Sequence, residues 1–268
     1  MEDRIAVQLN KYPSKALEKM STFVLIVALV IWSMQVGAIG AIKEDGLNIA
    51  KGIITGILQP DGALLFNLTM QGVPYLLLET VCIAFLGTIV GGMLAVPLAF
   101  LSASNVVPKG VAFIVRMLIM AIRTIPAFVY GLMFIRVTGP GPFAGLLSMS
   151  FISIGMLCKL YKEAIEDMDT HILESFDALG CTTFEKIRYG ILPQLLPSFL
   201  STLIYRFDMN IRDAAILGLV AAGGIGAPLI FAMSSYRWHE AGAIIIGLAV
   251  LIIIIEFFST KLRNKLVG

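Results

Sequence analysis

The sequence predicts an all-α membrane protein with about six transmembrane helices and both termini in the cytoplasm. Of its 268 residues, 58% are apolar and only 14% are charged, whereas a soluble domain of this size is apolar over nearer half of its residues. Apolar windows long enough to cross about 30 Å of hydrocarbon recur along the chain, and Lys and Arg gather in alternate connecting loops. We therefore expect lipid to surround most of the chain.

The N-terminal segment, residues 1–21, carries Arg4 and three Lys residues and precedes an apolar window at 22–42. A basic flank before an apolar run is also the layout of a signal sequence. At about 20 residues, however, this window exceeds the apolar core of a signal peptide and can span a bilayer. Cleavage after the small residues near Gly40 is the alternative. We expect an uncleaved first transmembrane helix, with the segment before it in the cytoplasm.

Residues 43–74 form a longer polar stretch with a Gln-Pro-Asp-Gly turn signal, which predicts an extracytoplasmic surface loop. Further apolar windows build a core transmembrane domain over residues 75–260, and residues 261–268 are expected to form a cytoplasmic tail. These windows lie near 75–101, 111–136, 143–161, 196–222 and 240–259. The sequence Gly139-Pro140-Gly141-Pro142 predicts a tight turn, because neither residue type continues a helix there.

The placement of basic residues predicts the orientation. Most of the 20 Lys and Arg residues lie in the segments that this topology assigns to the cytoplasm. Those assigned to the outer side are Lys43, Lys51, Arg136 and Arg237. The positive-inside rule then gives two cytoplasmic termini, which agrees with an even number of spans.

The cytoplasmic segment 166–193 has the pattern of two short amphipathic helices joined at Gly180. Apolar residues recur at helical spacing before Gly180, which stands where a left-handed residue commonly ends a helix. Thr182 and Glu185 then form a Thr-x-x-Glu capping box that begins the second helix, and we expect Gly190 and Pro193 to end it. Such a segment could lie on lipid headgroups or pack beneath the bundle.

The fifth predicted span contains charged residues that should not face lipid. At 100° per residue, Arg206, Asn210 and Asp213 lie on one helix face, whereas Asp208 and Arg212 form an i, i+4 pair on nearly the opposite face. Either these groups are structural ion pairs to neighbouring spans, or one face lines a translocation path for an anion. The residues of this path or charge network are Glu79, Arg123, Arg206, Asp208, Asn210, Arg212 and Asp213.

A glycine-rich stretch follows the fifth span and ends near Pro228. Gly in membrane helices usually permits close packing. So many glycines beside a proline also indicate a broken helix, and irregular backbone at membrane depth is tolerated inside protein or along a cavity. We predict a gate that contains Gly223, Gly224 and Gly226.

The spacing around Gly180 resembles the EAA loop of permease subunits of ATP-binding cassette (ABC) importers, which docks into a groove on the ATPase subunit. In this pattern Glu174 comes six residues before Gly180, and Leu192-Pro193 follows the second short helix. The resemblance implies contact with an ATPase for Glu174, Phe176, Asp177, Ala178, Gly180, Phe184, Leu192 and Pro193. The sequence departs from the pattern at Ser175 and Phe176, where the family has two alanines, and at Gly190, where it has an apolar residue.

The resemblance to phosphonate-type permeases extends from Glu79 to the C-terminus, and in that family a Gly before Ile-Leu-Pro is ordinary. The matching segments are Glu79-Thr80 with Gly87-Thr88, Arg123-Thr124-Ile125-Pro126, and the stretches at 139–145, 187–196, 205–212 and 217–226.

This resemblance implies a type I ABC importer permease fold in the bacterial inner membrane. It also implies a homodimer with two ATPase subunits, which bind ATP and Mg, and an extracytoplasmic binding protein. That binding protein would deliver phosphonate or a related phosphorus oxyanion, namely phosphite, hypophosphite or phosphate. A methionine-type or other small-solute importer is the alternative.

Other classes of membrane protein fit the sequence less well. No Gly-x-x-x-x-Gly-Lys-Ser/Thr segment occurs, so this chain does not itself bind ATP phosphates as a P-loop does. A secondary transporter usually shows two repeated halves with paired broken helices, whereas only one such break is visible. Neither His has partners at ligand spacing and the three Cys lie far apart, so we expect no metal, no cofactor and no catalytic residue in this chain.

Overall fold

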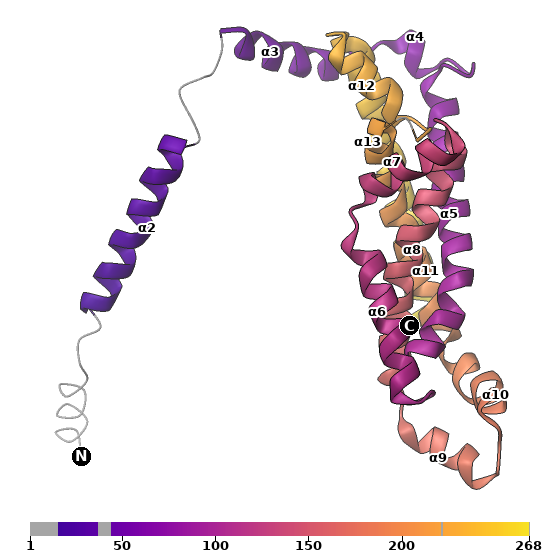
Figure 1. The fold of residues 1–268 in the computed structure, drawn as a ribbon. Coiled ribbons are helices and arrows are strands. Elements are labelled where there is room, and N and C mark those ends of the chain that lie inside the picture. The colour runs from indigo at the N-terminus through magenta and orange to yellow at the C-terminus, as the bar shows by residue number, and fades with distance from the viewer. Residues whose placement is uncertain (1–15, 37–43, 221, 268) are drawn as a thin grey trace, which may run out of the picture. The chain divides into compact units, whose positions relative to one another are not determined.

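The computed structural model of the chain describes residues 16–36, 44–220 and 222–267, and the regular elements in these ranges are helices (Figure 1). The chain divides into two units, Met1–Lys51 and Gly52–Gly268. No strand occurs in the described ranges, which confirms the predicted all-α class.

Helix α2, Ala16–Val36, is the transmembrane helix expected at 22–42. It begins ahead of the predicted start because Ala, Leu, Glu, Lys and Met at residues 16–20 are good helix formers. The predicted end of this helix and the alternative cleavage point near Gly40 lie outside the described residues. Most of the predicted N-terminal segment lies outside them as well.

The stretch 43–74 is more helical than the predicted surface loop. It contains α3, Glu44–Leu58, and the short α4, Gly62–Leu65. The Asp61 carboxylate caps α4 by accepting a hydrogen bond from the backbone N–H of Ala63 at 2.9 Å. The turn signal therefore marks a break between two helices.

Two long helices, α5 (Val73–Ser102) and α8 (Pro142–Glu166), share the most extensive contact in the second unit (Figure 1). They approach closely because α5 has glycine where a side chain would collide with α8. A Cβ added to Gly91 would lie only 2.6 Å from the Cβ of Ser153. The core of the second unit is thus built on this helix pair.

The window at 111–136, expected as one span, is a bent pair of helices. Helix α6, Lys109–Thr124, and helix α7, Ala127–Thr138, meet at an angle of 87°. Pro126 explains the bend, because its ring holds Ile125 in an extended conformation and removes a helical N–H donor. The Gly-Pro-Gly-Pro sequence then forms the predicted turn into α8, with positive φ at Gly139 and Gly141.

Helix α11, Leu192–Leu217, packs against α5, α8 and α13. A short 3₁₀ turn η2, Gly218–Val220, ends it, and α12, Gly226–Ser234, follows. The last helix, α13, runs from Trp238 to Val267, so residues 261–267 continue a helix where the sequence suggested a separate tail. Lys265 in its last turn suits the negative end of the helix dipole.

The largest buried apolar cluster joins α5, α6, α8 and α11 near the ends of α5 and α8. Within it, the rings of Tyr161 and Phe199 stack with centroids 4.3 Å apart, and the Tyr161 hydroxyl donates a hydrogen bond to the Phe199 carbonyl at 3.2 Å. This cluster fixes the end of the bundle that leads into the segment 166–193.

Four described helices, α2, α5, α8 and α13, are long and apolar enough to cross a membrane, and the bent pair α6 and α7 is a fifth if its two helices form one span. Helix α11 is also long enough at 26 residues, although its Pro, Gln and charged residues make it less apolar than those four helices. With α11 included, the described helices agree with the prediction of about six spans.

Candidate functional site

The segment between α8 and α11 begins with α9, Thr170–Ala178, whose N-cap is Asp169. The Asp169 carboxylate accepts a hydrogen bond from the backbone N–H of His171 at 3.0 Å. The helix ends at Ala178, and two residues later Gly180 has a φ of +74° and donates its N–H to the Asp177 carbonyl at 2.9 Å. Gly180 therefore has the left-handed conformation that the sequence predicted.

The predicted capping box is present at the start of α10, Thr183–Glu185. The Thr182 hydroxyl accepts a hydrogen bond from the Glu185 backbone N–H, and the Glu185 carboxylate accepts the Thr182 backbone N–H at 2.7 Å. Hydrogen bonds from the Thr182 N–H and hydroxyl lower the pKa of Glu185. The capping box is therefore formed with the ionised carboxylate.

The sequence suggested that the second short helix ends at Gly190 and Pro193, but the chain remains helical through both residues. A π-helical turn η1, Lys186–Ile191, follows α10 and leads directly into α11. Pro193 lies in the first turn of α11, where its missing N–H removes no helical hydrogen bond. The segment is consequently continuous with the long membrane helix, so a force on α10 can act directly on α11.

Two contacts hold α9 against η1. The aromatic ring of Phe176 lies on Gly190, where an added Cβ would stand 2.8 Å from Cε2 of the ring. Lys186 forms an ion pair with Asp177. Phe176 and Gly190 are two of the positions at which the sequence departs from the EAA pattern, and the structure places them in contact. The large side chain of Phe176 thus occupies the space that Gly190 leaves by having no side chain.

Among the side chains of this segment that the structure describes, three large apolar ones are strongly exposed. Leu179, Phe184 and Tyr189 are 77%, 67% and 63% exposed, respectively. Of the residues predicted to contact an ATPase, Phe176 and Leu192 are partly buried. The remaining ones are exposed, namely Glu174, Asp177, Ala178, Gly180, Phe184 and Pro193. The predicted set lacked Tyr189, whose position on η1 depends on a π-helical turn that residue spacing did not indicate.

One charged face of α11 points into the bundle. The Arg206 guanidinium is only 3% exposed and lies 3.2 Å from the Asp213 carboxylate. The Asn210 side-chain amide donates hydrogen bonds to the hydroxyl of Thr88 at 2.7 Å and to that of Ser153 at 2.8 Å. The two hydrogen bonds of Asn210 tie α11 to α5 and α8.

The opposite face of α11 carries the pair formed by Asp208 and Arg212. The Arg212 guanidinium lies 2.9 Å from the Asp208 carboxylate and 3.2 Å from that of Glu256 on α13. The structure therefore confirms the predicted separation of the charges into two faces, and the second face binds α11 to α13.

Glu79 and Arg123 do not pair with α11, although the sequence suggested them as its partners. The Glu79 carboxylate accepts the backbone N–H of Gly224 at 3.0 Å. Arg123 has no ion pair among the described residues, and its aliphatic chain crosses α8 at Gly155, where an added Cβ would lie 2.7 Å from the Arg123 Cγ. Contacts with Thr88, Ser153 and Glu256 replace the expected ones because helix rotation, which sequence alone does not fix, decides which side chains meet.

The glycine-rich stretch breaks the helix, as predicted. Gly223 and Gly224 have φ values of +82° and +71°, and the turn rests on α5. The Thr80 hydroxyl accepts the Ile225 backbone N–H at 2.9 Å, next to the bond between Glu79 and Gly224. Side chains of α5 thus satisfy the N–H groups at the start of α12.

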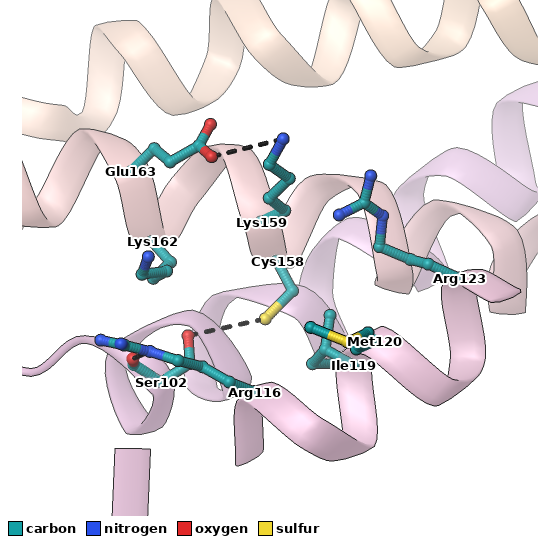
Figure 2. A pocket seen from close by; sticks show the side chains of 9 residues that line it. All are labelled: Ser102, Arg116, Ile119, Met120, Arg123, Cys158, Lys159, Lys162 and Glu163. Atoms are coloured by element: carbon teal, nitrogen blue, oxygen red, sulfur yellow. Dashed lines mark hydrogen bonds and ion pairs between the residues drawn. The ribbon is translucent and has the colours of Figure 1, made fainter. Parts of the chain in front are cut away.

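A cavity of about 200 Å³ lies between the end of α5, α6 and α8 (Figure 2). No pattern in the sequence had indicated this cavity. Its lining residues are Ser102, Arg116, Ile119, Met120, Arg123, Cys158, Lys159, Lys162 and Glu163. The signal that could have found it is the i, i+3 spacing of Lys159 and Lys162, which places both cations on one face of α8. Among the described residues, no cluster of His, Cys, Asp or Glu could hold a metal ion.

Comparison with known proteins gives a consistent result. Residues 95–266 match the family model described as "Binding-protein-dependent transport system inner membrane component". The phosphite transport system permease protein PtxC of Stutzerimonas stutzeri is 31% identical over 189 residues, which cover 70% of this chain and 69% of that protein. The phosphate-import permease protein PhnE of Mycolicibacterium smegmatis is 33% identical over 190 residues, 70% of this chain and 36% of that protein.

The fold is similar to that of a solved transporter. An inward-facing structure of the MetNI methionine ABC transporter aligns with a TM-score of 0.62 at 19% identity, over 72% of this chain and 94% of that chain. At this level of identity the similarity concerns the fold alone.

Proposed function

Because the chain belongs to the family of binding-protein-dependent transport system inner membrane components, we propose that it carries a phosphorus oxyanion through the inner membrane as the permease subunit of an ABC importer. The cargo is phosphonate, phosphite, hypophosphite or phosphate. ATP hydrolysis in partner ATPase subunits drives the uptake, and the permease chain itself is not catalytic.

The observation that carries this proposal is the 31% identity to a phosphite permease over more than two thirds of both chains. The similar identity to a phosphate-import permease supports the same class of cargo. The likeness to the methionine transporter, at 19% identity, supports the fold without supporting methionine as the substrate. A methionine-type cargo, the alternative that the sequence leaves open, is the second candidate.

The segment 166–193 is the proposed docking element for the ATPase. Its exposed Leu179, Phe184 and Tyr189 offer apolar contacts to a groove, and Phe176 and Gly190 keep α9 and η1 together. Because η1 continues into α11, movement of the ATPase is transmitted directly to the span that carries Arg206 and Asp208. This element acts in the cytoplasm, and both termini lie there too, as the distribution of Lys and Arg predicts.

The proposed complex contains two copies of this chain, two ATPase subunits that bind ATP and Mg, and an extracytoplasmic binding protein. In each copy, the broken segment at Gly223, Gly224 and Gly226 serves as the gate. Irregular backbone next to the carboxylate of Glu79 supports this role, because such a segment can change conformation without unwinding a long helix. The ion pairs of α11 fit a structural role, since Arg212 joins α11 to Glu256 on α13 and Arg206 already has Asp213 as a partner on its own helix.

Competition in cells tests the proposed cargo. Cells that express the chain with its partner subunits should take up radiolabelled phosphite, and unlabelled phosphonate or phosphate should compete if it shares the site. Cells without this chain should lose that uptake. Uptake of labelled methionine that phosphorus oxyanions do not inhibit would replace the proposal with the second candidate.

A further inference from the structure

The cavity between α5, α6 and α8 holds more positive than negative charge. Its cationic side chains are Arg116, Arg123, Lys159 and Lys162 (Figure 2). The carboxylates beside them belong to Glu163 in the lining and to Glu166 at the end of α8. The cations therefore outnumber the neighbouring carboxylates, and we call this site the cation pocket.

The ion pairs in the cation pocket leave cationic donors unused. Glu166 binds Arg116 at 2.5 Å and Lys162 at 2.7 Å, so one carboxylate serves two cations. Lys159 contacts Glu163 at a looser 3.4 Å. Arg123 has no carboxylate partner among the described residues, and its five N–H donors are suited to an external anion.

The cations form a row along the bundle. One face of α8 carries Lys159 and Lys162, with Gly155 one turn before them. The side chain of Arg123 crosses this face at Gly155. With a rise of 1.5 Å per residue, Gly155 lies about 16 Å from Glu166 at the helix end. An unpaired cation this far along a membrane helix is costly in lipid, so it requires water or an anion. The row connects the middle of α8 to its cytoplasmic end.

We propose that the cation pocket binds a tetrahedral phosphoryl oxyanion. The Arg123 guanidinium offers a planar fork and Lys159 a compact charge, and both recognise phosphate oxygens. Arg116 already has a structural role, since its Nε donates to the Ser102 carbonyl at 2.8 Å. Within the described part of the chain, neither Arg123 nor Lys159 joins two helices through an ion pair. The oxyanion has two sources. It is either the transported ion on its way to the cytoplasm, which rests on the proposed function, or the headgroup of an anionic phospholipid.

Protection of a thiol in the pocket tests this proposal without requiring transport. Met120 lines the pocket and is 58% exposed, so Met120→Cys, with Cys82, Cys158 and Cys181 replaced by Ala, supplies the reporter. The complete complex is placed in phosphatidylcholine nanodiscs, and maleimide labelling is followed with inorganic phosphate or with sodium chloride of equal ionic strength. Phosphate at ten times its dissociation constant should slow labelling about tenfold, because about one site in eleven remains free.

Two controls assign the effect to the pocket. Asn264→Cys, exposed at the end of α13, should label at the same rate with and without phosphate. Adding Arg123→Gln with Lys159→Gln to the reporter should abolish protection. The matched change Lys261→Gln with Lys265→Gln removes the same charge from α13 and should preserve protection.

Changing the nanodisc lipid distinguishes a transported ion from a phospholipid headgroup as the source of the oxyanion. If a headgroup occupies the pocket, phosphatidylglycerol nanodiscs should slow labelling in the absence of phosphate, and the change at Arg123 and Lys159 should reverse this. If the transported ion is the occupant, only phosphate should protect, equally in both lipids. Labelling that neither phosphate nor phosphatidylglycerol changes, in a complex that still transports an oxyanion, would overturn the pocket proposal alone. Protection by phosphate in a complex that transports no oxyanion would refute the proposed function and leave the pocket in place.

Discussion

The contact between Phe176 and Gly190 leads to a specific expectation for a pair of substitutions. In Gly190→Leu, the new side chain meets the Phe176 ring from its first carbon, at 2.8 Å, and overpacking of this kind costs about 1–3 kcal/mol. Leu gains back up to about 1 kcal/mol over Gly in helical backbone. The single change should therefore destabilise the loop by up to about 2 kcal/mol. An equal loss in docking free energy would weaken ATPase binding by up to about 30-fold.

The second substitution should reverse the first. In Phe176→Ala with Gly190→Leu, the lost ring leaves room for the added side chain, and volume-conserving changes usually cost under about 1.5 kcal/mol. Phe176→Ala alone should also weaken binding, because it removes the ring that joins α9 to η1. The two effects should thus be strongly non-additive, as expected for residues in contact.

The dissociation constant of the ATPase from nanodisc-embedded permease measures these effects. Gly110→Leu is the matched control, because Gly110 lies in α6 with no atom within 4 Å of an added Cβ, and it should leave the constant unchanged. If Gly190→Leu binds the ATPase as tightly as the unsubstituted chain, or the double change is no better than either single one, the contact has no role in docking.

Three further substitutions follow from the structure. The Gly180→Val variant should insert normally but lose ATPase-coupled transport, because the positive φ at this position costs a β-branched residue at least about 1 kcal/mol. The Gly180→Asn variant should retain coupled transport, since Asn tolerates this backbone conformation. Full coupling in the Val variant would exclude a docking role for the segment. Asp213→Asn should lower the free energy of unfolding by about 3–5 kcal/mol, because it leaves Arg206 buried without its partner. The double variant Arg206→Met with Asp213→Asn should be more stable than this single variant in a thermal unfolding assay. An assembled double variant that transports nothing would instead assign Arg206 to the substrate path. Thr182→Cys should resist an impermeant thiol reagent in sealed cells, and rapid labelling would reverse the topology.

Local sequence signals predicted much of the cytoplasmic segment. The capping box at Thr182, the left-handed Gly180 and the break at Gly223 and Gly224 each depend on a few neighbouring residues, so their patterns were readable. The opposite charged faces of α11 followed from the helical period alone.

Contacts between distant segments were harder to predict. The hydrogen bond from Gly224 to Glu79 and the fit of Phe176 on Gly190 depend on how helices are rotated and placed, which no local pattern encodes. The bend at Pro126 is different, because the proline itself signals a break in a helix. The long apolar run around it nevertheless led to the prediction of a single span. The cation pocket combines α6 with α8, and it required the packing of the two helices to be known.

Coupled transport in proteoliposomes shows whether the chain is the permease of an ATP-driven importer of phosphorus oxyanions. The permease, its ATPase and its binding protein are reconstituted with ATP on the cytoplasmic side, and accumulation of radiolabelled phosphite is measured. Phosphite accumulation should require ATP, the binding protein and the ATPase. It should fall in the Phe176→Ala variant, because this change weakens docking of the ATPase. Phosphite uptake that proceeds without the ATPase, or ATP-driven uptake of methionine with none of phosphite, would contradict the proposed function.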